Sequence, residues 1–252
     1  MKLHSPERSK TQGDAMPALR APLPSDIASL TRPDELASFL AEAARSLGFD
    51  YFAYGRKPAL PLANPPASII SNYPSAWQQR YAEAEYVKND PTIAASRRSM
   101  RPLVWSDEVF AGAKQLWSEA RDAGLQVGCA QFITDGFGNR GMLTLARSHE
   151  PLTERELQAK STQIHWLSVL VHEHFPRIYP QEQHAFEIPS LTEREIEILR
   201  WSADGKTVAE IAAMLPISSH TVNFHMKNAM EKLAAPNKSA AILRAAMLGL
   251  LE

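Results

Sequence analysis

The most regular pattern of apolar and polar positions lies near the C-terminus, between Leu191 and Leu251. Apolar residues recur there at the three- and four-residue spacing of amphipathic helices, which predicts short helices around one small core. One apolar stripe consists of Val208, Ile211, Ala212 and Leu215, and the next consists of Val222, Met226, Ala229, Met230 and Leu233. Gly205 precedes the first stripe and Pro216 separates the two, so the pattern predicts a helix, a tight turn and a second helix.

Helix starts in this region have their own capping residues. These are Thr192 with Glu195, Thr207 with Glu210, and Ser218. The run Leu152–Leu157 repeats the helix start of Leu191–Ile196 almost letter for letter, far from the helix-turn-helix pattern. This start therefore indicates a helix and says nothing about function.

The helix after the turn has a polar face that predicts DNA binding. The face consists of His220, Asn223, Phe224 and Lys227, which recur at helical spacing opposite the apolar stripe. No Asp or Glu occurs between Glu210 and Glu231, so this face can approach phosphates without repulsion. In a helix-turn-helix, the second helix enters the major groove. The alternative is an ordinary solvated surface, because the region is neutral overall and only its charge distribution favours DNA.

The last helix predicts a dimer. Asn237 can cap a helix that starts at Lys238, and residues 240–251 are apolar almost all the way round, interrupted by Arg244. Such a helix must be buried, and a domain this small has too few other elements to cover both sides of the helix. A second copy of the chain would cover it, and a two-fold dimer calls for an inverted-repeat DNA site. The alternative is packing against the rest of the same chain.

Upstream of this region, strand-like and helix-like segments alternate. Short apolar runs with strand character occur at Phe49–Tyr54, Ser68–Ser71, Leu103–Trp105, Cys129–Thr134 and Gly141–Ala146. Helical patterns occur at Pro33–Leu47, Ser75–Glu85, Pro91–Arg98, Ser106–Ala123 and Thr153–Phe175. This mixture predicts an α+β fold in which helices flank a sheet.

Length and composition set the domain organisation. The chain of 252 residues suits one medium domain and one small one, and its charge is nearly balanced, with 27 basic and 28 acidic residues. The single cysteine, Cys129, excludes an internal disulfide and suits a reducing cytoplasm. Residues 1–24 are polar and proline-rich, which predicts a disordered tail with no signal peptide and no membrane partner. We expect domains at 25–175 and 191–252, joined by a linker at 176–190.

An aromatic set surrounds one acidic residue in the first domain. Tyr73, Trp77 and Tyr81 are spaced by four residues, and Asp90-Pro91 and Trp105 follow. Rings with polar tips can enclose a small apolar ligand while their N–H and O–H groups fix its orientation. The alternative is a hydrophobic core beside a helix cap, because aspartate before proline is an efficient N-cap. The residues alone leave both interpretations open.

Both regions resemble a known family. The C-terminal region resembles the LuxR-type helix-turn-helix through Leu191–Glu195, Trp201, Asp204–Thr207, Glu210–Ala212, Ile217–Ser218, Thr221–Val222, His225, Lys232–Leu233 and Asn237–Lys238. The first domain is similar to the acyl-homoserine-lactone-binding domain of quorum-sensing receptors in that family through Tyr73, Trp77, Tyr81, Asp90–Pro91 and Trp105. The resemblance covers the chain from about Ser25 onward. It implies an α/β/α sandwich with a central antiparallel sheet, followed by a four-helix DNA-binding domain.

The resemblance also implies a role for each residue of the aromatic set. Trp77 would donate its indole N–H to the lactone carbonyl, Asp90 would accept the amide N–H, and Tyr73 would donate to the amide carbonyl. Thr144 would supply a second hydroxyl, while Trp105 and Tyr81 would pack on the lactone ring and the start of the acyl chain. A buried amide needs such partners, because each unpaired polar group costs about 1–3 kcal/mol.

On the DNA side, the resemblance places the helix from Ser218 to Lys232 in the major groove. Asn223, Phe224 and Lys227 would face bases, and Lys206, Ser219 and Thr221 would lie near phosphates. Asn223 departs from the family, in which a basic residue is common at this position, so the family's site preferences transfer poorly. Phe224 has the alternative of packing inside the domain.

Together these features predict a cytoplasmic quorum-sensing transcription regulator, without catalysis, cofactor or metal. We expect an N-acyl-homoserine lactone to complete the core of the first domain and to stabilise a homodimer that binds promoter DNA and acts with RNA polymerase.

Three alternatives remain at this stage. The same kind of DNA-binding unit could respond to a different small ligand. A phosphorylated response regulator would need an early acidic cluster, for which the chain offers only Asp50. An enzyme would need a base beside a nucleophile such as Cys129. The later histidines, His165, His172 and His174, lack metal-site spacing and are expected at a surface or an interface.

Overall fold

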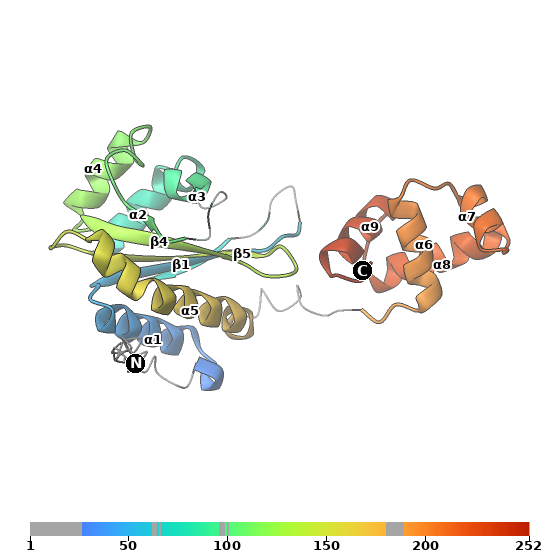
Figure 1. Ribbon diagram of the computed structural model, residues 1–252, viewed down its shortest axis with the longest axis horizontal. Coiled ribbons are helices and arrows are strands. Elements are labelled where there is room, and N and C mark those ends of the chain that lie inside the picture. The colour runs from blue at the N-terminus through green and yellow to red at the C-terminus, as the bar shows by residue number, and fades with distance from the viewer. Residues whose placement is uncertain are drawn as a thin grey trace, which may run out of the picture.

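The computed structural model describes residues 27–61, 65, 67–95, 99, 101–179 and 189–251, which form two folded units (Figure 1). The last helix of the first unit ends at Ile178, and the first helix of the second begins at Glu193. The predicted tail at 1–24 and most of the predicted linker at 176–190 lie outside the described residues.

The first unit is built on a five-stranded antiparallel sheet with the strand order β2-β1-β5-β4-β3. The strands are β1 (Tyr51–Lys57), β2 (Ser68–Ser71), β3 (Leu103–Val104), β4 (Val127–Thr134) and β5 (Arg140–Arg147). Successive side chains alternate between the two faces, and partners in register share a face. Phe52 pairs with Leu145 and faces one side with it, whereas Ala53 pairs with Thr144 and faces the other.

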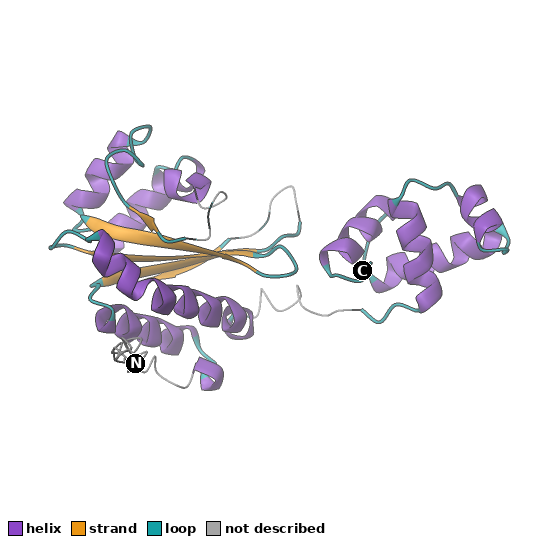
Figure 2. Cartoon of the chain, in the orientation of Figure 1, coloured by secondary structure: helices purple, strands orange, loops and turns teal. Residues whose placement is uncertain are grey.

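Helices cover both faces of this sheet, which confirms the sandwich that the resemblance implies (Figure 2). They are α1 (Pro33–Ser46), α2 (Ser75–Glu83), α3 (Pro91–Ala95), α4 (Lys114–Asp122) and α5 (Glu154–Ile178), with 3-10 turns η1 (Ile27–Ser29) and η2 (Tyr86–Lys88). In Figure 1, α1 and α5 lie on one face, and α2, α3 and α4 lie on the other. The apolar core between α1, α5 and the sheet includes Phe39, Phe52, Leu145, Leu167 and Phe175. No helix in the described part of the chain is long and apolar enough to cross a lipid bilayer.

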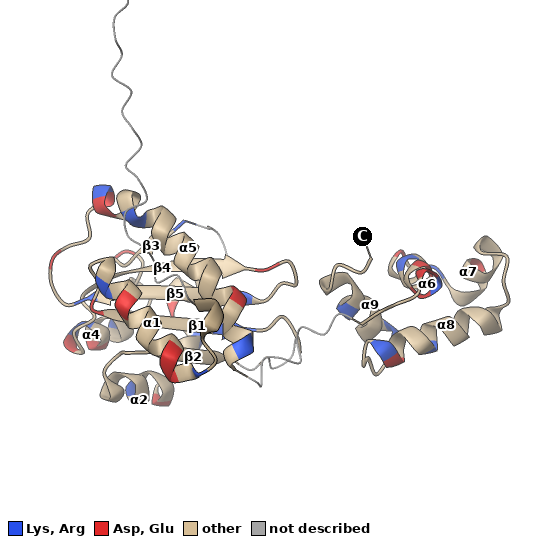
Figure 3. Ribbon diagram, turned by 90° about the horizontal axis from the view of Figure 1, so that it is seen from below, with Lys and Arg blue, Asp and Glu red and all other residues tan. Residues whose placement is uncertain are grey.

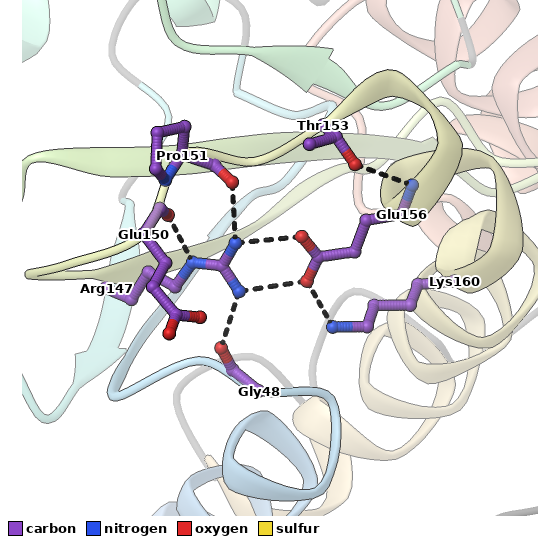
Figure 4. Close-up of polar contacts among 7 residues, drawn as sticks. All are labelled: Gly48, Arg147, Glu150, Pro151, Thr153, Glu156 and Lys160. Carbon is purple, nitrogen blue, oxygen red and sulfur yellow. Dashed lines mark hydrogen bonds and ion pairs between the residues drawn. The ribbon is translucent and has the colours of Figure 1, made fainter.

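Arg147, the last residue of β5, ties the sheet to α5 (Figure 4). Its guanidinium donates to the two carboxylate oxygens of Glu156 at 2.9 and 2.8 Å. It also donates to three main-chain carbonyls, those of Gly48, Glu150 and Pro151. The hydrogen bonds from Arg147 lower the pKa of Glu156 to about 2, and Lys160 adds a second cation beside it. We call these contacts the Arg147 clamp.

The second unit consists of α6 (Glu193–Ala203), α7 (Val208–Met214), α8 (Ser219–Lys232) and α9 (Lys238–Met247). The two predicted apolar stripes meet in its core, where the fully buried or nearly buried residues include Ile211, Val222, Met226 and Ala229. Thr207 and Ser218 cap α7 and α8 as predicted. Gly205 takes a φ of +84°, which lets the chain leave α6 and turn into α7. Helices α7 and α8 are therefore the two helices of the helix-turn-helix.

The two similar helix starts differ in what their glutamates do. At α6, Thr192 and Glu195 form the reciprocal capping box, and Glu195 also accepts a hydrogen bond from Lys232 of α8 at 2.8 Å. At α5, Thr153 accepts from the backbone N–H of Glu156, but the Glu156 carboxylate is taken up by the Arg147 clamp. The shared motif begins both helices, whereas the hydrogen-bond partners of each glutamate depend on the residues that surround it.

The last helix ends at Met247 rather than continuing to Leu251. Ala241 and Ala245 are buried against the other helices of the unit, and Arg244 donates to the carbonyl of Leu233 at 2.7 Å. The inner face of α9 therefore packs on its own chain. For this face, the alternative prediction of packing within the same chain is confirmed. Dimerisation itself stays a prediction.

Two of the predicted helices have bounds that differ from the structure for an identifiable reason. Only Lys114–Asp122 of the predicted helix at Ser106–Ala123 is helical, because the preceding segment forms turns that bury Phe110. Helix α5 continues through Pro176 to Ile178, beyond the predicted end at Phe175. Proline removes one helical hydrogen bond, and near a helix end this loss is small.

The prediction that His172 lies at a surface is wrong. Its side chain is 5% exposed and lies in the core beneath α5. Its Nδ1 is 2.7 Å from Tyr54 Oη, and its Nε2 is 3.5 Å from a carboxylate oxygen of Asp135. The Tyr54 hydroxyl gives one ring nitrogen a hydrogen-bond partner, which favours burial of this histidine and which sequence spacing does not reveal.

Candidate functional site

One face of the sheet has mostly small side chains where it meets α2 and α3. Ala53 of β1, Thr144 of β5 and Ala130 of β4 lie opposite one another in register. Gly55 and Gly128 lie two residues away on their strands and share this face. We call these five positions the floor. Small side chains here let other groups approach the sheet closely, as Trp105 does at Gly128.

Aromatic side chains surround the floor. Three of them on α2 and η2 have ring centroids 5.9 to 6.1 Å apart, namely Trp77, Tyr81 and Tyr86. Trp105 lies directly over Gly128, where an added Cβ would approach Trp105 Cε3 to 2.7 Å. Trp105 also packs edge-on against Phe110 and Trp117, each at 6.2 Å between centroids. Glycine at 128 is therefore required for this wall.

Asp90 lies beside these rings, and its two oxygens have different partners. Oδ1 accepts from the backbone N and from Oγ1 of Thr92, at 2.8 and 2.6 Å, which caps α3. Oδ2 accepts from Tyr81 Oη at 2.9 Å. A carboxylate oxygen can accept two hydrogen bonds, so Oδ2 has capacity for one further donor. One residue can therefore be both the helix cap and a ligand acceptor.

Two buried donors at this site have no hydrogen-bond partner among the described residues, Tyr73 Oη and Trp105 Nε1. Burial, together with the charge of Asp90, raises the pKa of Tyr73 well above its usual range, so the hydroxyl stays protonated and can donate. Burial likewise raises the pKa of Tyr81. Because an unpaired buried donor costs about 1–3 kcal/mol, acceptors supplied by a bound molecule would stabilise the domain.

The structure gathers the predicted ligand residues on one side of the sheet. Tyr73, Trp77, Tyr81 and Trp105 belong to one apolar cluster, Asp90 is bonded to Tyr81, and the register of β5 turns Thr144 to the same face. Sequence analysis missed four further residues around the site, Tyr86, Thr92, Phe110 and Trp117. The capping rule could have indicated Thr92, because it lies two residues after Asp90. Phe110 was hidden by the helix predicted across it.

The predicted DNA face is exposed along α8. His220, Asn223, Phe224 and Lys227 are all exposed, with Phe224 at 55%. Phe224 therefore does not pack inside the domain, and that alternative is wrong. Lys227 lies 3.8 Å from Glu231, but both side chains are highly exposed, so such a pair adds little stability and leaves the amine available. Figure 3 shows that the acidic positions of this unit lie mainly on α6 and α7.

The residues expected near phosphates lie around the start of α8 and before α7. Ser219 is exposed, whereas Lys206 and Thr221 are half-buried. Thr221 also serves the helix start, because its backbone N–H donates to Ser218 Oγ at 3.0 Å and its hydroxyl lies 2.8 Å from the same atom. Ser219 and Thr221 therefore lie in the first turn of α8, and Lys206 lies before α7.

An α/β sandwich domain with a cluster of aromatic side chains beside Asp90, followed by a helix-turn-helix, is the architecture of a ligand-responsive transcription regulator. Residues 32–175 match the autoinducer binding domain, and residues 189–245 match the bacterial regulatory proteins of the luxR family. The chain belongs to this family of autoinducer-binding, LuxR-type regulators.

Individual relatives support the same assignment. The chain is 47% identical over 220 residues to the transcriptional activator protein AnoR of Acinetobacter nosocomialis, covering 86% of this chain and 92% of AnoR. It is 38% identical over 215 residues to the quorum-sensing regulator RhlR of Pseudomonas aeruginosa, covering 84% and 88%. The structure of Escherichia coli SdiA in complex with octanoyl-rac-glycerol is similar with a TM-score of 0.71 at 33% identity, covering 90% of this chain and 92% of that one.

Members of this family regulate transcription and are not enzymes. The structure gives a physical reason why Cys129 is unsuited to nucleophilic chemistry. It pairs with Leu145 and lies on the face of the sheet opposite the aromatic site, with no exposed surface. Burial raises the pKa of its thiol to about 12, so the reactive thiolate is scarce at neutral pH.

Proposed function

We propose that the first domain binds an N-acyl-homoserine lactone and that the second domain binds promoter DNA in response. One observation carries the ligand class: an acceptor with spare capacity, Asp90 Oδ2, lies in the same aromatic site as a buried donor without an acceptor, Tyr73 Oη. An acyl-homoserine lactone supplies one amide N–H, two carbonyl oxygens, those of the amide and of the lactone ring, and an apolar acyl chain. Its polar groups therefore complement those of the site.

In this proposal, each predicted residue keeps the role that the family resemblance implies. Asp90 accepts the ligand amide N–H, Tyr73 donates to the amide carbonyl, and Trp77 donates to the lactone carbonyl. Trp105 and Tyr81 pack on the lactone ring and the start of the chain. The acyl chain lies over the floor, where Thr144 offers a hydroxyl between the methyl groups of Ala53 and Ala130.

Ligand binding and DNA binding are coupled through stability. A ligand that binds only the folded domain stabilises it by mass action, and a completed core favours one arrangement of the chain. In this proposal the liganded form is a homodimer that binds an inverted-repeat site and acts with RNA polymerase. The exposed Trp166 on α5, 52% accessible, and the half-buried outer side of α9 are apolar surfaces that a second copy could cover.

Base recognition falls to the exposed face of α8. Asn223 can pair with adenine through two hydrogen bonds, Phe224 can contact the methyl group of thymine, and Lys227 can donate to guanine. Lys206, Ser219 and Thr221 contact phosphates and fix the position of the helix.

Replacing Phe224 by alanine is expected to weaken specific DNA binding roughly five- to twentyfold, because the exposed ring loses its contact with a thymine methyl group. Replacing that thymine by uracil in the DNA removes only the methyl and should weaken wild-type binding about fourfold. The Phe224→Ala variant should no longer respond to uracil. Gel-shift titrations of both proteins on both DNAs measure this.

Met214 provides a matched control for Phe224. It is another exposed apolar residue of the helix-turn-helix, 43% accessible, at the end of α7. The Met214→Ala variant should bind both DNAs as the wild type does. If Phe224→Ala retains full affinity, or still distinguishes uracil from thymine, Phe224 does not read a methyl group.

A fatty acylglycerol is a second candidate ligand, favoured by the octanoyl-rac-glycerol in the SdiA structure. Its ester carbonyl can accept from Tyr73, and a glycerol hydroxyl can donate to Asp90. It lacks the amide N–H, however. Octanoyl-rac-glycerol therefore belongs in every ligand panel used with this protein.

Selection of DNA from a random duplex pool tests the combined function. The full chain is incubated with the pool alone, with N-acyl-homoserine lactones of several chain lengths, or with octanoyl-rac-glycerol. We expect inverted repeats to be enriched, and more strongly with one of the lactones. Enrichment of single half-sites would contradict the dimer, and equal enrichment without any ligand would contradict the coupling.

A further inference from the structure

An ion pair joins two helices across the outer side of the aromatic site. Arg80 of α2 donates through Nε and Nη2 to the two carboxylate oxygens of Glu119 of α4, at 2.7 and 2.9 Å. Tyr86 Oη and Gln115 Nε2 donate to the same carboxylate at 2.8 and 2.9 Å. The hydrogen bonds from Arg80 are the main reason that the pKa of Glu119 falls to about 2, so this carboxylate is ionised at neutral pH.

Helix α4 is a firm support for this pair. Leu116, Trp117 and Ala120 are all buried beneath it. The ring of Trp117 stacks on Phe110 with 4.6 Å between centroids, and its Nε1 donates to Asp107 at 2.6 Å. Moving α4 would therefore disrupt packed aromatic contacts.

Helix α2 has fewer attachments. Its buried residue is Trp77, and most of its other side chains are exposed. The chain just before it is anchored to β1 through Asn72, whose side-chain carbonyl accepts from Phe52 N at 2.7 Å. The bond from Tyr81 to Asp90 joins α2 to the segment that follows it. Within the described ranges, the direct hydrogen bonds between α2 and α4 are those from Arg80 to Glu119.

The ion pair also lies against the rings that form the site. The Arg80 guanidinium is 5.7 Å from the centroid of the Tyr86 ring, which contacts Trp77 at 6.1 Å and Tyr81 at 5.9 Å. Trp77 and Tyr81 are themselves residues of α2. If α2 moved away from α4, both rings would move with it and open the site.

We propose that Arg80 and Glu119 form a latch that holds α2 closed over the bound ligand and slows its release. This inference rests on the proposed ligand site. Arg80 and Glu119 are positioning residues, because they act on the ligand only through Trp77 and Tyr81. Their side chains are 44% and 28% exposed, so dissolved salt weakens the pair. Release of the ligand should therefore become faster as ionic strength rises.

The dissociation rate of the ligand from the full chain tests the latch. Protein is loaded with tritiated N-butanoyl-, N-octanoyl- or N-dodecanoyl-homoserine lactone and then chased with unlabelled ligand. Arg80→Gln and Glu119→Gln are expected to release the ligand roughly three- to tenfold faster than the wild type. Tyr86→Phe removes one hydrogen bond to Glu119 and should have a smaller effect. The exchanged pair Arg80→Glu with Glu119→Arg should restore slow release.

Two comparisons separate a latch from a general loss of stability. Lys88→Gln breaks an exposed ion pair with Glu85. This pair lies at η2, beside Tyr86, but does not reach α4. The Lys88→Gln variant should therefore release the ligand at the wild-type rate. Raising salt from about 0.05 M to about 0.5 M should speed release from the wild type and change the Arg80→Gln rate little.

Several outcomes would overturn the latch. Equal release rates for wild type and Arg80→Gln would do so while leaving the proposed ligand intact. Fast release from a folded protein with the exchanged pair would have the same consequence. A wild-type protein that binds none of the three lactones would overturn the proposed ligand class together with the latch.

Discussion

Replacing Asp90 by asparagine is expected to weaken lactone binding roughly 100-fold while the domain stays folded. Asparagine is also a good helix cap, so its side-chain carbonyl can keep accepting from Thr92. The amide group then points its N–H₂ toward Tyr81 and the ligand. Two donors face each other where a charged acceptor stood before, and the ligand amide loses its partner. Competition binding with N-octanoyl-homoserine lactone measures the loss.

Asp34→Asn is the matched control for Asp90→Asn. Asp34 lies at the start of α1, on the other side of the sheet, where its partner is the exposed Arg32. This variant should bind ligand as the wild type does. Full affinity in a folded Asp90→Asn protein would show that Asp90 is a helix cap and nothing more.

Replacing Arg147 by methionine is expected to lower the free energy of unfolding of the first domain by about 2–4 kcal/mol. The Arg147 side chain is 9% exposed and donates to Glu156 and to three main-chain carbonyls, and methionine can make none of these hydrogen bonds. Arg140→Met, an exposed position on the same strand, should change stability little. Denaturant unfolding of both variants distinguishes them.

The loss of unfolding free energy in the Arg147→Met variant should depend on pH in a defined direction. The Glu156 carboxyl has a pKa of about 2 in the folded domain, below its ordinary value of 4.5. A lowered folded-state pKa contributes stability above the unfolded value, and this contribution disappears as pH falls through the folded value. The difference between wild type and Arg147→Met should therefore be largest near neutral pH and shrink between pH 4.5 and about 2. A difference that is constant across this range would mean that the clamp acts through packing and not through the Glu156 charge.

The sequence predicted the second unit well because its signals are local. Capping residues, a glycine at a helix end and two apolar stripes lie within a few residues of the contacts that they specify. The buried stripe of α8 also predicted its exposed face, because helical spacing fixes which residues lie on the opposite side. The contact of α9 with its own unit was harder to predict, because an apolar helix does not reveal which surface covers it.

The first domain was predictable in its elements but not in its long-range contacts. Strand and helix patterns gave the sheet, whereas the pairing of Tyr54 with His172 joins residues far apart in the chain. The double use of Asp90 is similar. Its position before Pro91 indicates a helix cap, and only the fold shows that Oδ2 also accepts from Tyr81. The latch between Arg80 and Glu119 has no local signal at all.

Thermal unfolding of the full chain with a panel of N-acyl-homoserine lactones and octanoyl-rac-glycerol tests the central claim most directly. Ligand at about 100 times its dissociation constant stabilises the folded state by about 2.7 kcal/mol, which corresponds to a rise of roughly 5 °C or more in Tm. We predict such a rise with at least one lactone for the wild type, and a much smaller one for Asp90→Asn at the same concentration. A folded wild-type protein whose Tm does not change with any lactone would contradict the account.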